Sequence, residues 1–139
     1  MQVPLLDLKA QYATLRDEMR KAIDAVMESQ YFINGPAVGQ LEQAVAAYSG
    51  AKAAVGVSSG TDALIAALMS LEIGEGDEVI TTPYTFFATS GCILNANALP
   101  VYVDIDRESY NLDPARIEEA ITPRTRAILP VYFGGELAE

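Results

Sequence analysis

A serine–glycine–threonine corner, Ser58-Ser59-Gly60-Thr61-Asp62, is the segment of this 139-residue chain best suited to hold an anion. It lies where a predicted strand passes into a predicted helix, and ligands of open α/β sheets bind beyond the carboxyl ends of strands. The first turn of a helix offers free N–H groups and a partial positive charge, which suit a phosphate. Gly60 would allow close backbone approach, and Ser59 and Thr61 add hydroxyl donors. An ordinary helix cap uses the same residues, so this corner alone leaves both interpretations open.

Aromatic and acidic residues follow the next two predicted strands. Thr82-Pro83-Tyr84-Thr85-Phe86-Phe87 is predicted at the same sheet edge, where the ring of Phe86 could stack on a flat cofactor. Phe86 and Phe87 could equally be core residues or a hydrophobic staple at a helix start. Asp104 and Asp106 end the third predicted strand; paired carboxylates can bind metal or transfer protons, but aspartates at strand ends more often cap turns. We predict no metal site.

Lysine and histidine usage limits the catalysis available to the chain. There is no histidine, which removes Ser-His-Asp and Cys-His catalysis and zinc sites that contain histidine. The lysines are Lys9, Lys21 and Lys52. None has the desolvated or positively crowded surroundings that activate a Schiff-base lysine. We therefore assign no catalytic residue within these positions.

Composition excludes several classes of partner. Half of the residues are apolar, which is enough for a buried core, and the formal net charge is −10. That charge argues against nucleic acid and anionic membrane surfaces as partners. The single cysteine, Cys92, cannot form an internal disulfide. The first residues lack the pattern of a signal peptide, and no apolar run approaches the ~20 residues of a membrane span. We expect a cytoplasmic protein.

The order of apolar and turn-forming residues predicts an α/β fold. Residues 1–50 are expected to form a helical segment, with amphipathic helices from Leu8 to Val26 and from Val38 to Tyr48. Residues 51–139 alternate strands and helices, which indicates a mostly parallel sheet flanked by helices. Strands are expected at 53–57, 78–82, 100–104 and 126–133, and helices at 61–71, 86–97 and 114–121.

Seven short blocks share their order with one known family. They are Pro4–Lys9, Phe32–Pro36, Gly56–Leu64, Gly76–Ile80, Pro83–Phe86, Val103–Asp106 and Ala120–Ile128. In this order they resemble the DegT/DnrJ/EryC1/StrS family of aminotransferases, which depend on pyridoxal 5'-phosphate (PLP) and act on keto-sugars, usually linked to a nucleotide. The resemblance implies the N-terminal part of the large domain of fold type I PLP-dependent transferases.

The resemblance also implies roles for individual residues. Ser59, Gly60 and Thr61 would hold the PLP phosphate, and the ring of Phe86 would stack on the pyridine ring. The loop Phe32–Pro36 would lie near the active site at the interface of a homodimer. Glutamate, or glutamine in some members, would donate the amino group, and a nucleotide-linked keto-sugar would accept it.

The sequence departs from the family at its end. Tyr132 replaces a histidine, Glu136 stands where a neutral residue is usual, and Glu139 replaces an aspartate. In the family, the Schiff-base lysine, the acidic partner of the pyridine nitrogen and the C-terminal domain all lie beyond position 139. We therefore expect an incomplete PLP-binding domain, a fragment that does not transaminate by itself.

The family's sheet order predicts a further consequence of incompleteness. The strand at 53–57 pairs there with a strand beyond position 139, whereas the other three strands are contiguous. We expect 53–57 to be unpaired or re-paired, apolar surface to be exposed, and the isolated chain to aggregate or fold partially. Two alternatives remain: a short non-catalytic protein that binds a phosphorylated small molecule at Ser59–Thr61, or a fragment of a family sugar dehydratase.

Overall fold

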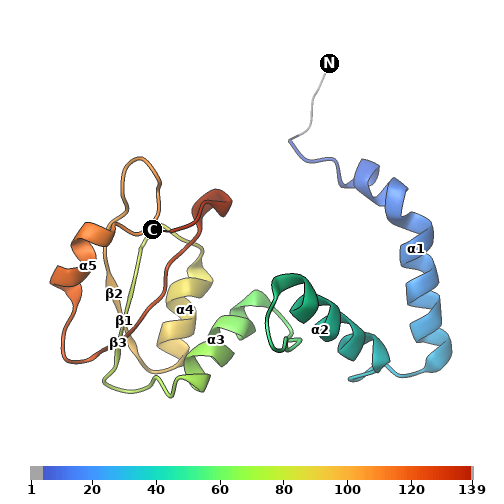
Figure 1. Ribbon diagram of the computed structural model, residues 1–139, viewed down its shortest axis with the longest axis horizontal. Coiled ribbons are helices and arrows are strands. Elements are labelled where there is room, and N and C mark those ends of the chain that lie inside the picture. The colour runs from blue at the N-terminus through green and yellow to red at the C-terminus, as the bar shows by residue number, and fades with distance from the viewer. Residues whose placement is uncertain (1–4, 139) are drawn as a thin grey trace. The chain divides into compact units, whose positions relative to one another are not determined.

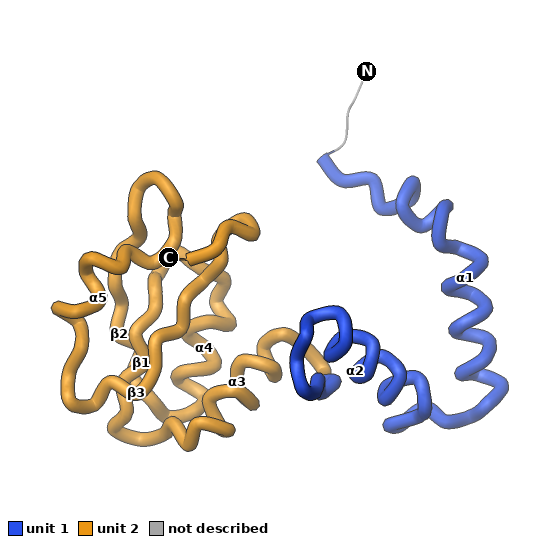
Figure 2. The backbone as a smooth tube through the Cα atoms, in the orientation of Figure 1, with its two compact units in different colours: residues 1–56 blue, residues 57–139 orange. Residues whose placement is uncertain are grey.

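The computed structural model describes residues 5–138, so Pro4 of the first family block and Glu139 lie outside the described residues. The chain divides into two compact units, residues 1–56 and 57–139 (Figure 2). Within residues 5–138, no helix is long and apolar enough to cross a membrane.

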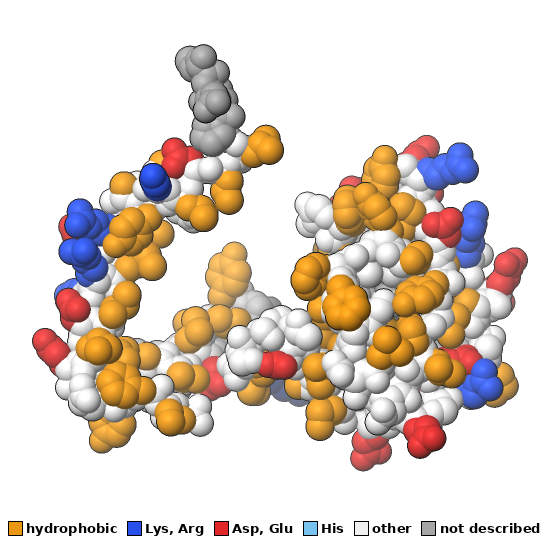
Figure 3. Space-filling view, turned by 180° about the vertical axis from the view of Figure 1, so that it is seen from behind, with side chains coloured by type: hydrophobic (Ala, Val, Ile, Leu, Met, Phe, Trp, Pro, Cys, Tyr) orange, Lys and Arg blue, Asp and Glu red, His pale blue; other side chains and the backbone are white. Residues whose placement is uncertain are grey.

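Unit 1 consists of two helices, α1 (Leu8–Ser29) and α2 (Pro36–Ser49) (Figure 1). The carboxylate of Asp7 caps α1 by accepting the Ala10 N–H at 3.0 Å, and Gly50 ends α2 in the left-handed conformation that glycine adopts freely. Both predicted helices are confirmed. Neither contains a buried residue, and Figure 3 shows the apolar side chains of α1 lying open.

The strand predicted at 53–57 is absent from the structure, so that prediction is wrong. Residues 51–56 close unit 1 as irregular chain, held at their end by the Gly56 N–H, which donates to Glu42 Oε1 at 2.8 Å. A strand needs a neighbour for its N–H and C=O groups, and no strand among residues 5–138 pairs with this segment. Val55 is 79% exposed. The expectations of an unpaired segment and of exposed apolar surface are confirmed.

Unit 2 is built on a three-stranded parallel sheet in the order β2-β1-β3. The strands are β1 (Glu78–Thr81), β2 (Leu99–Tyr102) and β3 (Thr125–Ile128). The contiguous parallel group is therefore as predicted, but β3 stops well short of residue 133. Leu129 still donates to the Ile80 carbonyl at 2.8 Å, and the next residue is Pro130, which has no N–H to continue the ladder.

Helices cover both faces of the sheet, as predicted. Unit 2 contains α3 (Gly60–Ser70), α4 (Phe87–Asn95) and α5 (Pro114–Ala120). Because successive side chains of a strand point to opposite faces, β1 supplies both layers of the core. Val79 packs with Leu68 and Ile93 of α3 and α4, whereas Ile80 packs with Leu112 and with Ile117 of α5. Figure 1 shows α4 and α5 on opposite sides of the strands.

Candidate functional site

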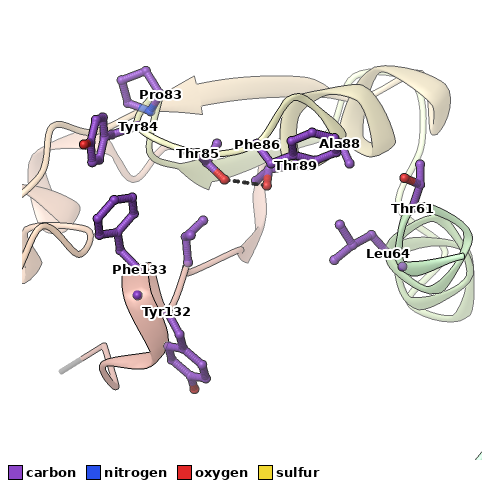
Figure 4. Close-up of a pocket in the computed structure, with 13 residues that line it drawn as sticks. Thr61, Leu64, Pro83, Tyr84, Thr85, Phe86, Ala88, Thr89, Tyr132 and Phe133 are labelled. Carbon is purple, nitrogen blue, oxygen red and sulfur yellow. Dashed lines mark hydrogen bonds between the residues drawn. The ribbon is translucent and has the colours of Figure 1, made fainter. Parts of the chain in front are cut away.

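The predicted corner and the predicted aromatic ring lie on one pocket of about 740 Å³ in unit 2. Three segments line it: the start of α3, the chain after β1, and the chain after β3 (Figure 4). The lining residues are Gly60, Thr61, Leu64, Pro83, Tyr84, Thr85, Phe86, Ala88, Thr89, Val131, Tyr132, Phe133 and Gly134. Parallel strands bring segments distant in sequence to the same sheet edge, which is the usual position of ligand sites in such sheets.

Ser59 shapes the start of α3 without lining the pocket. It is the N-cap, and its Oγ accepts the backbone N–H of Asp62 at 3.1 Å. The hydroxyl of Ser58 donates to the Asp62 carboxylate, which fixes the first turn from its other side. Ser59 therefore positions the helix start, and the pocket itself meets the next two residues.

Gly60 and Thr61 present the free N-terminus of α3 to the pocket. Among the described residues, no acceptor takes their backbone N–H groups, and the first intrahelical bond of this turn joins Ala63 N–H to Ser59 O at 3.0 Å. A side chain at Gly60 would meet nothing within 4 Å, and no positive φ requires glycine there. The helix end and the open space at Gly60 together fit a phosphate group.

Phe86 supplies an exposed ring to the same pocket. It is the extended N-cap of α4 and is 78% exposed. Phe87 is equally exposed but does not line the pocket; a side chain added at Gly91 would come within 3.3 Å of the Phe87 ring, so this ring lies over the first turns of α4. The interpretation of the two residues as core is therefore wrong. A bare ring beside a helix N-terminus suits a flat, phosphorylated ligand.

An aromatic contact that the sequence did not predict forms the pocket wall opposite Thr61 (Figure 4). Tyr84, which follows β1, packs against Phe133 with ring centroids 4.8 Å apart, and Tyr110 lies 6.2 and 6.0 Å from these two rings. Tyr84 was within a motif that the sequence singled out. Phe133 gave no local signal, because its contact with Tyr84 depends on β1 and β3 being neighbours.

Two other pocket residues carry polar groups. The hydroxyls of Thr85 and Thr89 are hydrogen-bonded to each other at 2.8 Å. Tyr132, which departs from the family's histidine, also lines the pocket, and Figure 4 shows its ring directed away from the Tyr84–Phe133 contact. Glu136 is not among the lining residues. The loop Phe32–Pro36 belongs to unit 1, so its predicted role stays a proposal.

No charged side chain is among the pocket's lining residues in the described chain. The groups with shifted pKa values lie elsewhere in unit 2. Hydrogen bonds from Thr122 and then Arg124 lower the pKa of Glu78, and backbone N–H groups of Ser109 and Glu108 lower that of Asp106. Neither of these two carboxylates lines the pocket.

Asp104 and Asp106 act in the turn that follows β2. Asp106 Oδ1 accepts the backbone N–H groups of Glu108 and Ser109 at 3.0 and 2.9 Å, as in a capped turn. Asp104 Oδ1 accepts the adjacent Ile105 N–H at 2.9 Å. The interpretation as a turn cap is confirmed for Asp106, whereas Asp104 bonds only the next residue and lies 4.0 Å from the Arg116 guanidinium.

A parallel sheet whose edge joins a helix N-terminus to an exposed aromatic ring defines a ligand-binding α/β domain. Residues 13–139 match the DegT/DnrJ/EryC1/StrS aminotransferase family, and the chain belongs to this family. The predictions of the family and of its α/β fold are confirmed.

Curated relatives match almost the whole chain. A pleiotropic regulatory protein from Geobacillus stearothermophilus is 50% identical over 100% of this chain and 37% of its own length. A UDP-N-acetyl-3-dehydro-alpha-D-glucosamine 3-aminotransferase from Acidithiobacillus ferrooxidans is 48% identical over 96% of this chain and 36% of its own. The chain thus spans about a third of the length of these relatives.

Solved structures confirm the fold. DesV from S. venezuelae, in complex with a ketimine intermediate, has a TM-score of 0.96 and 46% identity over 99% of this chain and 37% of its own. NtdA from Bacillus subtilis, with bound cofactor PMP, has a TM-score of 0.94 and 34% identity over 99% and 32%. Solved relatives hold the cofactor in PMP and PLP forms, which confirms the prediction of pyridoxal phosphate for this family.

Proposed function

We propose that this chain is the amino-terminal part of an enzyme that transfers an amino group to a nucleotide-linked keto-sugar with the help of PLP. The observation that carries the proposal is the meeting of Gly60, Thr61 and Phe86 on one pocket in a chain of this family. Relatives named for a UDP-linked dehydro-glucosamine and for a dTDP-linked amino-trideoxy-glucose support the class of acceptor.

The proposed task of these residues is to bind and orient the cofactor. The N–H groups of Gly60 and Thr61, with the Thr61 hydroxyl, would hold the phosphate at the positive end of α3, while Ser59 keeps the helix start in place. The Phe86 ring would lie against the flat ring of the cofactor. When bound, PLP supplies the electron sink that the amino transfer needs.

Proton transfer is proposed to come from residues outside this chain. No lysine lines the pocket in the described residues. An amine that attacks a carbonyl must lie in the site with a lowered pKa. We therefore propose that the 139-residue chain supplies the phosphate corner and the stacking ring of the cofactor site, and that it does not transaminate alone.

The remaining parts of the proposal concern donor, assembly and location. Glutamate or glutamine is proposed as the amino donor, and a homodimer as the working assembly. Exposed apolar side chains along α1, including Leu15, Met19 and Ile23, support a partner surface. Cys92 is buried and free, which fits the reducing cytoplasm as the proposed location.

Isotope transfer in the complete gene product that carries residues 1–139 tests this function. The protein is supplied with PLP, ¹⁵N-labelled glutamate or glutamine, and UDP- or dTDP-linked 3-keto-sugars, and the nucleotide-sugar products are analysed by mass spectrometry. We expect an aminated sugar that carries the ¹⁵N label. A dehydrated sugar without nitrogen would identify a dehydratase instead, and PLP binding without turnover would indicate a non-catalytic binding protein.

A further inference from the structure

Asn111 is a buried polar residue that the proposed chemistry does not use. It lies between β2 and α5, outside the lining of the pocket, and is only 2% exposed. A buried amide is costly unless its oxygen and its nitrogen both find partners. In Asn111 both do, and every partner of the side chain lies in one distant segment, Phe133–Leu137.

The side-chain amide of Asn111 is hydrogen-bonded to both ends of that segment. Its Oδ1 accepts the Phe133 N–H at 2.9 Å. Its Nδ2 donates to the Leu137 carbonyl at 3.2 Å and to the Glu136 carbonyl at 3.4 Å. Among the described residues, the hydrogen bonds that tie residues 130–138 to other elements of unit 2 all end on this side chain; the remaining ones are turn bonds within the segment.

The loop that carries Asn111 is itself fixed. The carbonyl of Asn111 accepts the Asp106 N–H at 2.9 Å, and the Asp106 carboxylate in turn caps the turn between them. Tyr110 holds a positive φ of 60°, which is uncommon for a residue with a side chain. Leu112, the next residue, is buried against Ile80 of β1. The backbone at Asn111 is therefore fixed by hydrogen bonds of its loop and by the buried side chain of Leu112.

The segment Phe133–Leu137 forms part of the pocket. Phe133 and Gly134 line it, and the Phe133 ring packs against Tyr84, two residues before Phe86. Gly134 has a φ of 64°, which lets the chain turn between the two ends that Asn111 holds. The course of this segment thus decides where the aromatic wall stands relative to the Phe86 ring.

We propose that Asn111 is a positioning residue of the cofactor pocket, which holds Phe133 and Gly134 as the wall opposite the phosphate corner. The proposal rests on the proposed function. It assigns Asn111 no contact with the ligand. Its effect is on the part of the pocket that meets the flat ring of PLP, whereas the phosphate corner at Gly60 and Thr61 does not depend on it.

Hydrogen exchange and paired ligands test this proposal. Exchange of peptides that span residues 130–138 is followed by mass spectrometry in the complete gene product that carries residues 1–139, as wild type, Asn111→Ala and Asn111→Asp, with Asn95→Ala, an exposed asparagine of α4, as matched control. Affinities for PLP and for inorganic phosphate are measured on the same samples. The affinity for inorganic phosphate depends on Gly60 and Thr61 alone, whereas the affinity for PLP depends also on the wall formed by Phe133 and Gly134.

We expect Asn111→Ala to speed exchange in residues 130–138 roughly tenfold, as the loss of hydrogen bonds to three backbone groups requires. Its PLP affinity should fall several-fold, by roughly the contribution of an aromatic wall, while its affinity for inorganic phosphate stays at the wild-type value. Asn111→Asp keeps the acceptor for the Phe133 N–H but places a charge near two carbonyls. It should therefore release residues 136 and 137 while the Phe133 N–H keeps its acceptor, and it provides a second variant if Asn111→Ala fails to fold.

Wild-type exchange in both Asn111 variants would overturn the proposal. Equal loss of PLP and phosphate affinity would also overturn it, because that pattern reports a merely structural role. If the wild-type chain binds neither ligand, the proposed function fails, and the exchange comparison still decides whether Asn111 holds the segment.

Discussion

The two ends of the central strand β1 differ in how completely their polar groups are used. At its start, Glu78 is 4% exposed, and its carboxylate accepts hydrogen bonds from Thr122 and from the Arg124 guanidinium, whose Nε lies 2.9 Å away. At its other end the chain continues to Phe86, whose ring is 78% exposed and lines one pocket with Gly60 and Thr61; the N–H groups of these two residues have no acceptor among the described residues. One end has its partners within the chain, and the other is open to a ligand.

This difference indicates that the start of β1 contributes to stability and that the pocket end contributes to ligand binding. A buried carboxylate with several donors stabilises the fold only while all of them remain. Unpaired N–H groups and an exposed ring contribute little to folding, but they gain partners when a ligand arrives. Substitutions at the start of β1 should therefore change stability, and substitutions at the pocket should change affinity.

Glu78→Gln is expected to reduce stability more than any substitution at the pocket. It leaves the Arg124 guanidinium without its anionic partner and weakens the bond from Thr122, so the urea midpoint measured by circular dichroism should fall clearly. Glu119→Gln, at an exposed glutamate of α5, is the matched control and should unfold like the wild type. Equal midpoints for the two variants would contradict the assignment of stability to this end of β1.

Acidification should reduce the stability that Glu78 contributes at the start of β1. The hydrogen bonds from Thr122 and Arg124 lower the pKa of Glu78 below its ordinary value of 4.5, so the folded state binds this proton less readily than the unfolded chain. The stability that Glu78 contributes is therefore complete above pH 4.5 and is lost as the pH falls through the lower folded pKa. Asp106, whose pKa is lowered from 3.8, adds a loss at lower pH.

Urea midpoints measured from pH 7 down to pH 3 test the sign of this effect. The wild type should lose stability progressively below pH 4.5, and Glu78→Gln should lose less over the same interval because its side chain does not titrate. A wild-type midpoint that rises on acidification would show that the sign is wrong.

Gly60→Ala should separate binding from folding at the pocket end. Nothing in the chain lies within 4 Å of the added methyl group, so stability should stay constant or rise by about 0.4–1 kcal/mol. Affinity for inorganic phosphate and for PLP should fall about tenfold, because the methyl group occupies space that the phosphate needs. Gly39→Ala, in α2 and equally open, should leave both affinities unchanged.

Phe86→Ala is expected to have a smaller effect than Gly60→Ala. Loss of one stacked ring should lower PLP affinity by roughly threefold to tenfold and leave phosphate affinity unchanged. Phe87→Ala removes a ring of equal exposure that does not line the pocket, and it should bind PLP like the wild type. Equal losses in the two variants, measured by equilibrium dialysis, would remove Phe86 from the site.

Local patterns in the sequence predicted most of the helices and the parallel group of strands, because spacing and capping residues act over a few positions. The strand at 53–57 was predicted wrongly because strand formation depends on a neighbour, which local sequence does not supply. The end of β3 was misplaced although Pro130 marks it. The grip of Asn111 on Phe133 spans 22 residues in sequence, and only the fold brings the two together.

Part of the site could also be predicted from local motifs in the sequence. Gly60 and Phe86 each belong to a short motif at a predicted strand end, so topology alone placed them at one edge of the sheet. Ser59 was grouped with them, and the structure places it in the helix cap instead of the pocket lining. Local sequence does not predict which of Phe86 and Phe87 lines the pocket, because the two rings are adjacent in sequence and equally exposed.

Hydrogen-exchange protection by ligand shows whether Gly60, Thr61 and Phe86 hold one cofactor. Peptides covering residues 59–62 and 83–89 are compared in the free chain, with inorganic phosphate and with PLP. We predict that phosphate protects only 59–62, whereas PLP protects both segments together. Protection of only one segment by PLP, or protection near Glu78 instead, would contradict the account.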